Sequence, residues 1–243
     1  MMTQGIYRVE YNRKLAPDVW ELRLSGDTEA VTAPGQFLNI KLEGFYLRRP
    51  ISICDWDGEG VTVLYKVVGR GTAALSDAEP GQDLDILCGL GNGFDVSKCG
   101  SRTLVIGGGA GVPPMYGLAK ALLRAGKTPI AILGFNKKEE IFYEERFRAL
   151  GIETVITTMD GSYGTKGFVT DAFPAEYDYF CACGPQPMLK AVYHTSKTSG
   201  LLSFEERMGC GFGACMGCSC KTKYGNKRIC KDGPVLEKEE IIW

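Results

Sequence analysis

Short runs of apolar residues alternate with polar ones through the first hundred positions of the chain. β-branched and aromatic side chains dominate these runs, and Gly, Pro and Asp separate them, which is typical of antiparallel strands. The expected strands are residues 6–11, 19–24, 37–42, 51–54, 61–67 and 83–87. This spacing predicts an antiparallel Greek-key barrel.

The pattern changes near residue 100, where longer amphipathic stretches begin to separate the apolar runs. Alternation of strands with helices favours a doubly wound parallel sheet. The expected strands are residues 103–106, 128–133, 153–158, 178–182 and 201–204, and the expected helices include 115–124 and 139–150. We therefore expect a barrel domain (1–100), an α/β domain (101–204) and a small cysteine-rich module (205–243).

Charge and composition exclude several classes of function. The 243 residues carry a net charge of −1, and no basic run stands out that would neutralise nucleic-acid phosphates. No apolar stretch approaches the roughly 18 residues needed to cross a membrane, and no apolar leader begins the chain, so a cytoplasmic protein is expected. His194 is the only histidine, which leaves little material for a Ser-His-Asp triad or a His-rich metal site.

Three of the ten cysteines form a C-x4-C-x2-C motif, and a fourth follows twelve residues later. This is the plant-type spacing of the ligands of a [2Fe–2S] cluster, which four thiolates hold. Glycines within the motif let the backbone wrap closely, so that N–H groups can point at sulfur. The expected metal ligands are Cys210, Cys215, Cys218 and Cys230.

Other interpretations of the cysteines remain open at this point. Zinc is the main rival, although structural zinc sites usually pair two short C-x2-4-C knuckles. Cys220 lies two residues beyond Cys218 and could replace a ligand, but the plant-type spacing makes it a bystander. No chemistry is assigned to the others, which read as small hydrophobic residues: Cys54, Cys88, Cys99 and Cys181.

Two glycine-containing turns follow expected strands of the α/β half. The first runs from Gly107 through Gly108, Gly109 and Gly111 into a helix with two early prolines, as in sites for a pyrophosphate. By itself this signal is weak, because tight turns need glycine anyway. The second turn is Cys183-Gly184-Pro185, and both turns should share the edge where parallel strands end. No carboxylate follows the second strand (134–138), so the choice between NAD and NADP stays open.

Basic residues and a glycine loop in the barrel half indicate a second phosphate-bearing ligand. Arg48 and Arg49 precede an expected strand, where a guanidinium can grip a diphosphate. Another strand, Leu64-Tyr65-Lys66, leads to the loop 69–72, whose amides could bind phosphate. Taken with the other motifs, these suggest a flavin.

Barrel, parallel sheet and cysteine module in this order resemble the ferredoxin reductase superfamily. Within it, the chain is similar to the electron-transfer subunits of class B dihydroorotate dehydrogenases over nearly its whole length. The motifs that carry the resemblance are Arg49–Ser52, Gly91-Asn92-Gly93-Phe94, Gly107–Gly109, Asp160-Gly161-Ser162-Tyr163-Gly164, Cys183–Pro185 and Glu206–Cys210. Ile51 stands where the wider superfamily has a tyrosine, which favours this branch.

The resemblance implies FAD on the barrel, NAD against the parallel sheet and a [2Fe–2S] cluster on the cysteines. The implied FAD residues are Arg49, Pro50, Ile51, Ser52, Leu64, Tyr65, Lys66, Gly71 and Thr72, and the implied NAD residues are Gly107, Gly108, Gly109, Gly111, Cys183, Gly184 and Pro185. Lys66 is often arginine in the family, which makes its contact the least secure.

It also implies a function and a partner. A catalytic subunit carrying FMN would oxidise dihydroorotate, in a heterotetramer of two plus two subunits, and this chain would pass the electrons to NAD+ for pyrimidine synthesis. Two alternatives are kept: a subunit of another flavin and iron–sulfur reductase, such as an NADPH–ferredoxin oxidoreductase, and a zinc-bearing binding module without a redox role.

Overall fold

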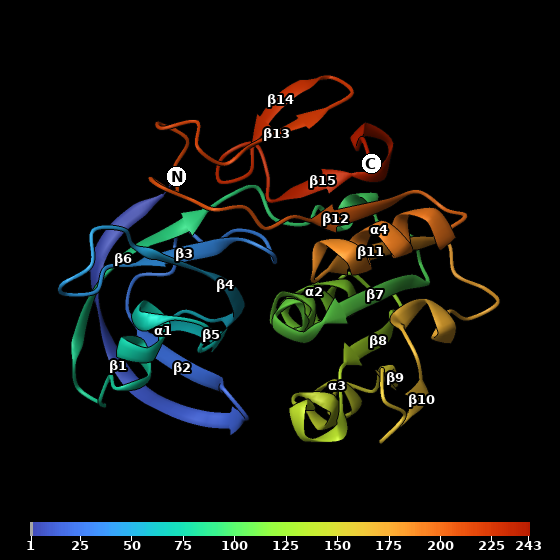
Figure 1. The fold of residues 1–243 in the computed structure, drawn as a ribbon, viewed down its shortest axis with the longest axis horizontal. Helices are drawn as coiled ribbons and strands as arrows, with labels where there is room; N and C mark the ends of the chain where they lie inside the picture. Colours follow the sequence, from blue (N-terminus) through green and yellow to red (C-terminus); the bar gives the residue numbers. More distant parts are fainter. Residues whose placement is uncertain (1) are drawn as a thin grey trace.

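Six antiparallel strands close into a barrel in the N-terminal half of the computed structural model, which describes residues 2–243 (Figure 1). Around the barrel the order is β1-β2-β5-β4-β3-β6. The strands are β1 (Thr3–Ala16), β2 (Val19–Ser25), β3 (Phe37–Ile40), β4 (Arg49–Trp56), β5 (Gly60–Lys66) and β6 (Asp83–Leu90). Leu22, Leu38 and Ile53 are among the apolar side chains that fill the interior. Closure leaves no unpaired edge.

The C-terminal half contains a seven-stranded sheet in the order β10-β9-β8-β7-β11-β12-β15. Neighbours are parallel except for β15, which pairs antiparallel with β12. The elements are β7 (Thr103–Gly108), α2 (Val112–Arg124), β8 (Ile130–Phe135), α3 (Glu144–Ala149), β9 (Glu153–Thr158), β10 (Thr165–Lys166), β11 (Tyr179–Cys183), α4 (Gln186–Thr195), β12 (Gly200–Ser203) and β15 (Val235–Glu237). The predicted fold class, a barrel followed by a parallel α/β sheet, is confirmed.

Two segments differ from the prediction. Residues 69–72, expected as a loop, begin the short helix α1 (Arg70–Ser76), with the Thr72 hydroxyl accepting hydrogen bonds from the Val68 and Gly69 amides. The expected helix 139–150 is interrupted, because only a 3-10 turn (Lys138–Glu140) and α3 are helical. Between them Tyr143 adopts a left-handed backbone (φ 67°), which turns its side chain into the interior.

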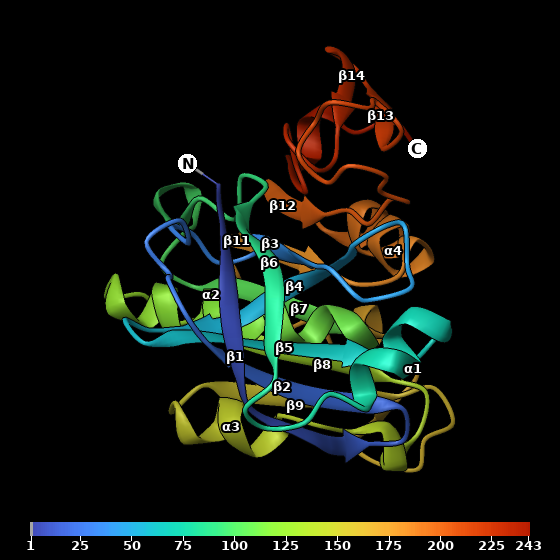
Figure 2. The same cartoon turned by 90° about the vertical axis from the view of Figure 1, so that its left-hand side faces the viewer.

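Residues of the cysteine-rich segment fold across one end of both halves, as the red ribbon in Figure 1 shows. The hairpin of β13 (Ser219–Thr222) and β14 (Gly225–Arg228) projects away from the body of the molecule (Figure 2). In contrast, β15 belongs to the seven-stranded sheet. Ile229 and Cys230, which precede it, are buried in the apolar core that this sheet shares. The segment therefore shares a sheet with the α/β half, and the division at residue 204 stays a prediction.

Barrel and sheet meet through α2, which packs against β4. Gly117 makes this close approach possible, since a Cβ there would lie 2.6 Å from the carbonyl oxygen of Cys54. An ion pair between Lys120 and Asp55 (2.5 Å) closes the edge of the contact. All four cysteines to which no chemistry was assigned lie in these cores: Cys54, Cys88, Cys99 and Cys181.

Candidate functional site

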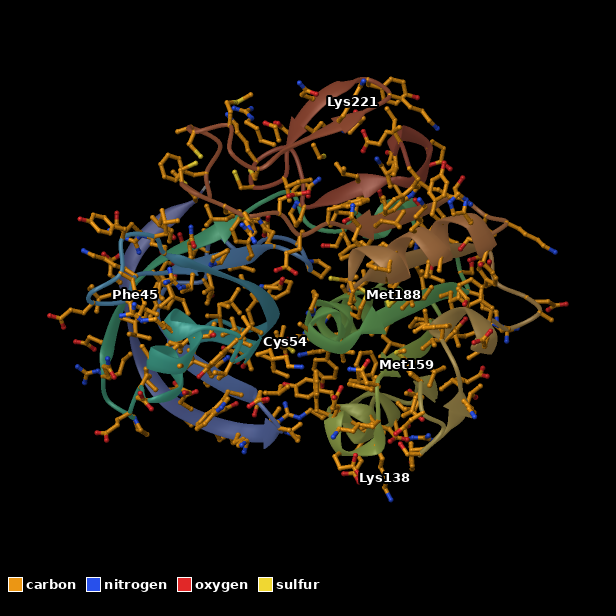
Figure 3. The ribbon with its side chains drawn as sticks, in the orientation of Figure 1. Phe45, Cys54, Lys138, Met159, Met188 and Lys221 are labelled. Atoms are coloured by element: carbon orange, nitrogen blue, oxygen red, sulfur yellow. The ribbon has the colours of Figure 1, made fainter. Side chains whose placement is uncertain are left out.

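A cavity of about 660 Å³ lies between the barrel and the carboxyl ends of the parallel strands. Ligands of open α/β sheets bind at this edge, in pockets that are mostly apolar with a few polar groups. Its lining from the barrel is Pro17, Val19, Leu64, Tyr65 and Lys66, and from the sheet it includes Gly108, Gly109, Phe135, Asn136, Glu140, Met159, Phe168, Pro185 and Met188. Figure 3 shows Met159 and Met188, which both come from the α/β half. The size and position suit a dinucleotide-type ligand held between the two halves.

The two glycine turns lie side by side at this edge, as expected. Gly107 is opposite Cys183 in the β7–β11 ladder, and a Cβ on Gly111 would lie 2.1 Å from the Cys183 carbonyl oxygen. Gly111 is therefore required for the two turns to pack. Among the seven residues predicted to bind NAD, three line the cavity, namely Gly108, Gly109 and Pro185.

Cys183, one of the residues expected to bind NAD, does not line the cavity. Its thiol lies next to the Ser203 hydroxyl, and burial raises its pKa to about 12 despite that hydrogen bond. A thiol with such a pKa stays protonated and unreactive near neutral pH. Its contact with NAD stays a prediction.

Sequence reasoning missed Glu140, which is an acidic residue in the cavity lining. The 3-10 turn after β8 brings it back beside Asn136, whose amide donates a hydrogen bond to the Glu140 carboxylate (2.8 Å). A ribose-binding carboxylate is expected at the end of the second strand, and Glu140 lies several residues beyond it. The pattern predicts a helix over residues 139–150, which does not reveal the turn that returns Glu140 to Asn136.

On the barrel side, Arg49 contacts the start of α1. A Cβ on Gly71 would lie 2.0 Å from Arg49 Nε, and the guanidinium also lies over the Phe45 ring at 4.7 Å. Arg49, Pro50, Ile51 and Ser52 are all half-buried, whereas the next residues of β4 are fully buried. The first four residues of β4 are therefore partly accessible beside the start of α1, where the resemblance places FAD.

The four cysteines expected to bind metal come together as two pairs. The Cys210 thiol lies near Cys215, and the Cys230 thiol lies near Cys218. No group of three potential ligand side chains converges on one point anywhere in residues 2–243. Two pairs suit a cluster with two irons, each bound by two thiolates, better than one tetrahedral zinc ion.

Backbone amides favour the thiolate form of Cys210. Burial raises its pKa, but N–H groups of Cys215, Phe212 and Ala214 outweigh that effect and lower it to about 6. The Ala214 amide lies 3.3 Å from Cys210 Sγ, and the Cys230 amide lies 3.4 Å from Cys218 Sγ. Amides aimed at sulfur are the arrangement that stabilises cluster-bound thiolates.

The pairs differ in exposure. Cys218 and Cys230 are 2% exposed, whereas Cys215 lies on the surface. Cys220 points elsewhere: it packs against the core beside Glu206, and burial raises the pKa of its thiol. Its expected role as a bystander fits this position.

No helix within residues 2–243 has the length and hydrophobicity needed to cross a membrane.

Comparison with known proteins identifies relatives over the whole length. A family profile described as "Iron-sulfur cluster binding domain of dihydroorotate dehydrogenase B" matches residues 205–242, and one described as "Oxidoreductase NAD-binding domain" matches residues 105–194. The "Dihydroorotate dehydrogenase B (NAD(+)), electron transfer subunit" of Geobacillus sp. (strain WCH70) is 44% identical over 257 residues, covering 100% of both chains. The protein of the same name from Fusobacterium nucleatum is 44% identical and covers 96% of both.

Among solved structures, that of an NADH-dependent reduced ferredoxin-NADP oxidoreductase matches with a TM-score of 0.88 at 29% identity, over 98% of this chain and 90% of that one. A ferredoxin NADP+ reductase from Neisseria gonorrhoeae shares the fold alone (17% identity, TM-score 0.68, 79% of this chain and 89% of that one). The first is a reductase of the alternative kind, but its identity is lower than that of the dihydroorotate dehydrogenase relatives. The expected resemblance is confirmed: the chain belongs to the family of electron transfer subunits of dihydroorotate dehydrogenase B (NAD(+)).

Proposed function

We propose that this chain takes electrons from the FMN of a dihydroorotate dehydrogenase catalytic subunit and delivers them through a [2Fe–2S] cluster and FAD to NAD+. The two cysteine pairs carry this proposal, because they lie on one molecule with a dinucleotide-sized cavity between two domains. NAD+ accepts two electrons as a hydride, an iron–sulfur cluster accepts one at a time, and a flavin can do both. The protein supplies binding, orientation and burial for these groups.

Cys210, Cys215, Cys218 and Cys230 are the proposed cluster ligands. Buried Cys218 and Cys230 anchor one side of the site in the core, while Cys210 is half-buried and Cys215 is exposed. Beside the outer pair, Phe212 and Met216 expose apolar side chains (41% and 54%). An exposed apolar rim around a redox site is suited to contact with a partner subunit.

For FAD, the partly accessible residues Arg49–Ser52 and the start of α1 are the proposed binding site. The Thr72 hydroxyl already serves the turn before α1, donating to the Gly69 carbonyl. Thr72 would therefore contribute its backbone N–H to a phosphate, as would Gly71, because amides in the first turn of a helix have no partner within the helix.

Gly71→Ala is expected to weaken FAD binding about tenfold, since a Cβ would displace the Arg49 guanidinium, whose charge-assisted hydrogen bonds are worth about 1.5–3 kcal/mol each. Gly69→Ala is the matched control, because a Cβ there meets nothing within 4 Å. Fluorescence titration of the deflavinated protein with FAD measures both. Equal affinity in the two variants would remove Arg49 from the flavin site.

Glu140 is proposed to favour NAD over NADP. It and Lys66 are the only charged residues in the described cavity lining, and a 2′-phosphate near Glu140 would meet a like charge. In Glu140→Gln the ratio of NADPH to NADH turnover is expected to rise roughly fivefold, as removal of about 1 kcal/mol of repulsion allows. Glu139→Gln, an exposed neighbour outside the lining, should leave the ratio unchanged. Steady-state diaphorase assays with NADH and with NADPH measure this ratio.

The catalytic partner is proposed to carry FMN and to assemble with this chain as two plus two subunits. Proton removal from dihydroorotate would fall to that partner. We place the complex in the cytoplasm, where thiols stay reduced, and all ten cysteines of the described chain are unpaired.

Anaerobic purification of the complex from its host, followed by assay of dihydroorotate-dependent NADH formation, tests the whole proposal. Activity with an FMN-containing second chain supports it. A brown, flavin-bearing preparation that reduces ferredoxin with NADPH and cannot use dihydroorotate would support the other reductase class. A colourless protein with zinc would favour the binding module.

A further inference from the structure

Asn39 is a buried polar residue of the barrel that contacts the cysteine-rich segment. It lies on β3, is 1% exposed, and its Nδ2 donates to the Cys210 carbonyl oxygen (3.4 Å). Its amide also fits against Gly211, where a Cβ would lie 2.2 Å from Nδ2. The Oδ1 atom is buried without a hydrogen-bond partner. A buried unpaired amide oxygen lowers stability, so an apolar side chain would be the more stable choice if filling space were the only need.

Asn92 makes a second contact between the same two parts. It follows β6, and its backbone N–H donates to the Gly233 carbonyl (2.7 Å). Its side chain pairs with the backbone of Val235 in both directions, Nδ2 donating (2.7 Å) and Oδ1 accepting (3.1 Å). The neighbouring Gly91 leaves room for Pro234, which lies 2.5 Å from where its Cβ would be. Through Gly91 and Asn92, the motif 91–94 joins the barrel to the cysteine-rich segment.

The two asparagines hold opposite ends of the proposed ligand set. Asn39 binds the backbone of the first cysteine, and Asn92 binds the residues that follow the last one, Cys230. Both asparagines belong to the barrel, which is the proposed flavin-binding half. Between these two contacts, the chain forms the projecting hairpin β13–β14.

We infer that Asn39 and Asn92 are positioning residues for electron transfer between the iron–sulfur cluster and the flavin. This rests on the proposed function and deepens it. By fixing both ends of the ligand segment to the barrel, they set the separation and orientation of the two redox groups while touching neither. Functional groups have to be held within about 0.5 Å of their working geometry by such supporting contacts.

The test uses the anaerobically purified complex, as wild type and as the Asn39→Leu, Asn92→Ala and Asn226→Ala variants. Asn226 is the control, since it is an exposed residue of β14 without a side-chain hydrogen bond in the described structure. Iron and sulfide content, the electron paramagnetic resonance spectrum of the reduced cluster, and stopped-flow reduction by NADH followed at flavin and cluster bands are compared.

We expect Asn39→Leu and Asn92→Ala to keep their iron and to reduce the flavin at the wild-type rate. Cluster reduction should slow several-fold, because the rate of electron transfer falls steeply as the two redox groups move apart, and the resonance spectrum of Asn39→Leu should shift. Asn226→Ala should match wild type throughout.

Cluster reduction and spectra equal to wild type in both variants would overturn the inference. So would loss of iron in both, because the asparagines would then serve retention of the cluster and not its placement. A wild-type complex that lacks the cluster, or lacks a flavin that NADH can reduce, would overturn the proposed function as well. Failure of the proposed function is therefore seen in the wild type, whereas failure of the inference is seen only in the variants.

Discussion

Cys218→Ser is expected to abolish the iron–sulfur cluster and, with it, dihydroorotate-linked reduction of NAD+. Cys218 is 2% exposed and adjoins Cys230, and its Sγ accepts from the Cys230 amide, so no neighbouring side chain can take its place. Iron content should fall to background, and NAD-linked turnover should fall by about 100-fold or more, the upper range for losses in the shell around a metal. Reduction of FAD by NADH should persist, because the cavity and the residues proposed to bind FAD lie outside the cysteine segment.

Cys220→Ser supplies a matched control two residues away, on β13. Its thiol packs against the core and belongs to neither cysteine pair. Visible spectra, iron analysis and both activities should match wild type. Loss of iron from Cys220→Ser would show that Cys220 is a ligand. A full cluster in Cys218→Ser would show that Cys218 is not one.

Glu21→Ala is expected to lower the free energy of unfolding by about 1.5–3 kcal/mol, the value of a hydrogen bond to a charged group. The reason is that the buried Tyr143 hydroxyl loses its acceptor, while Arg13 and Arg146 are half-exposed and stay solvated. Glu21 lies on β2, is fully buried, and accepts a hydrogen bond from the Tyr143 hydroxyl (2.6 Å). It also pairs with Arg146 at 3.0 Å and with Arg13 Nε at 2.7 Å. The carboxylate therefore joins the barrel to α3, and its removal leaves two guanidinium groups without their shared partner.

Tyr143 stays a hydrogen-bond donor in this network. Burial first, then the nearby Cys54 and Glu21, raise the pKa of its phenol, so it does not ionise at working pH. Urea unfolding followed by tryptophan fluorescence measures the effect of Glu21→Ala. Asp83→Ala is the control: its pair with Arg8 is more than half exposed on both sides, and such pairs contribute about 0–1 kcal/mol. Equal losses in the two variants would contradict a special role for Glu21.

The elements that could be predicted from the sequence are those whose apolar pattern reports burial directly. Barrel strands show alternation because one face is solvated, and the parallel strands read as continuous apolar runs because both faces are covered. In contrast, α1 is only seven residues long, and β13 and β14 are four residues each with half of their residues exposed, so none of them leaves a periodic signal.

Other features depend on contacts between residues distant in sequence. The break before α3 arises because Tyr143 reaches Glu21, 122 residues away, which overrides an amphipathic helical pattern. Similarly, Asn39 and Cys210 are 171 residues apart, and nothing local marks the pair. The cysteine spacing was predictable because one short loop supplies three of the four proposed ligands, whereas the cavity lining draws on many elements.

The antiparallel strand β15 has a consequence for the solubility of the chain. It pairs with β12 at the end of the seven-stranded sheet, so that the cysteine-rich segment also covers a strand edge. An uncovered edge is a template for pairing with other chains and for aggregation. β15 is now the edge of the sheet, but it is only three residues long, and very short edge strands offer little for such pairing. Cys230 lies five residues before β15, so a proposed cluster ligand and the strand that shortens this edge belong to one stretch of sequence.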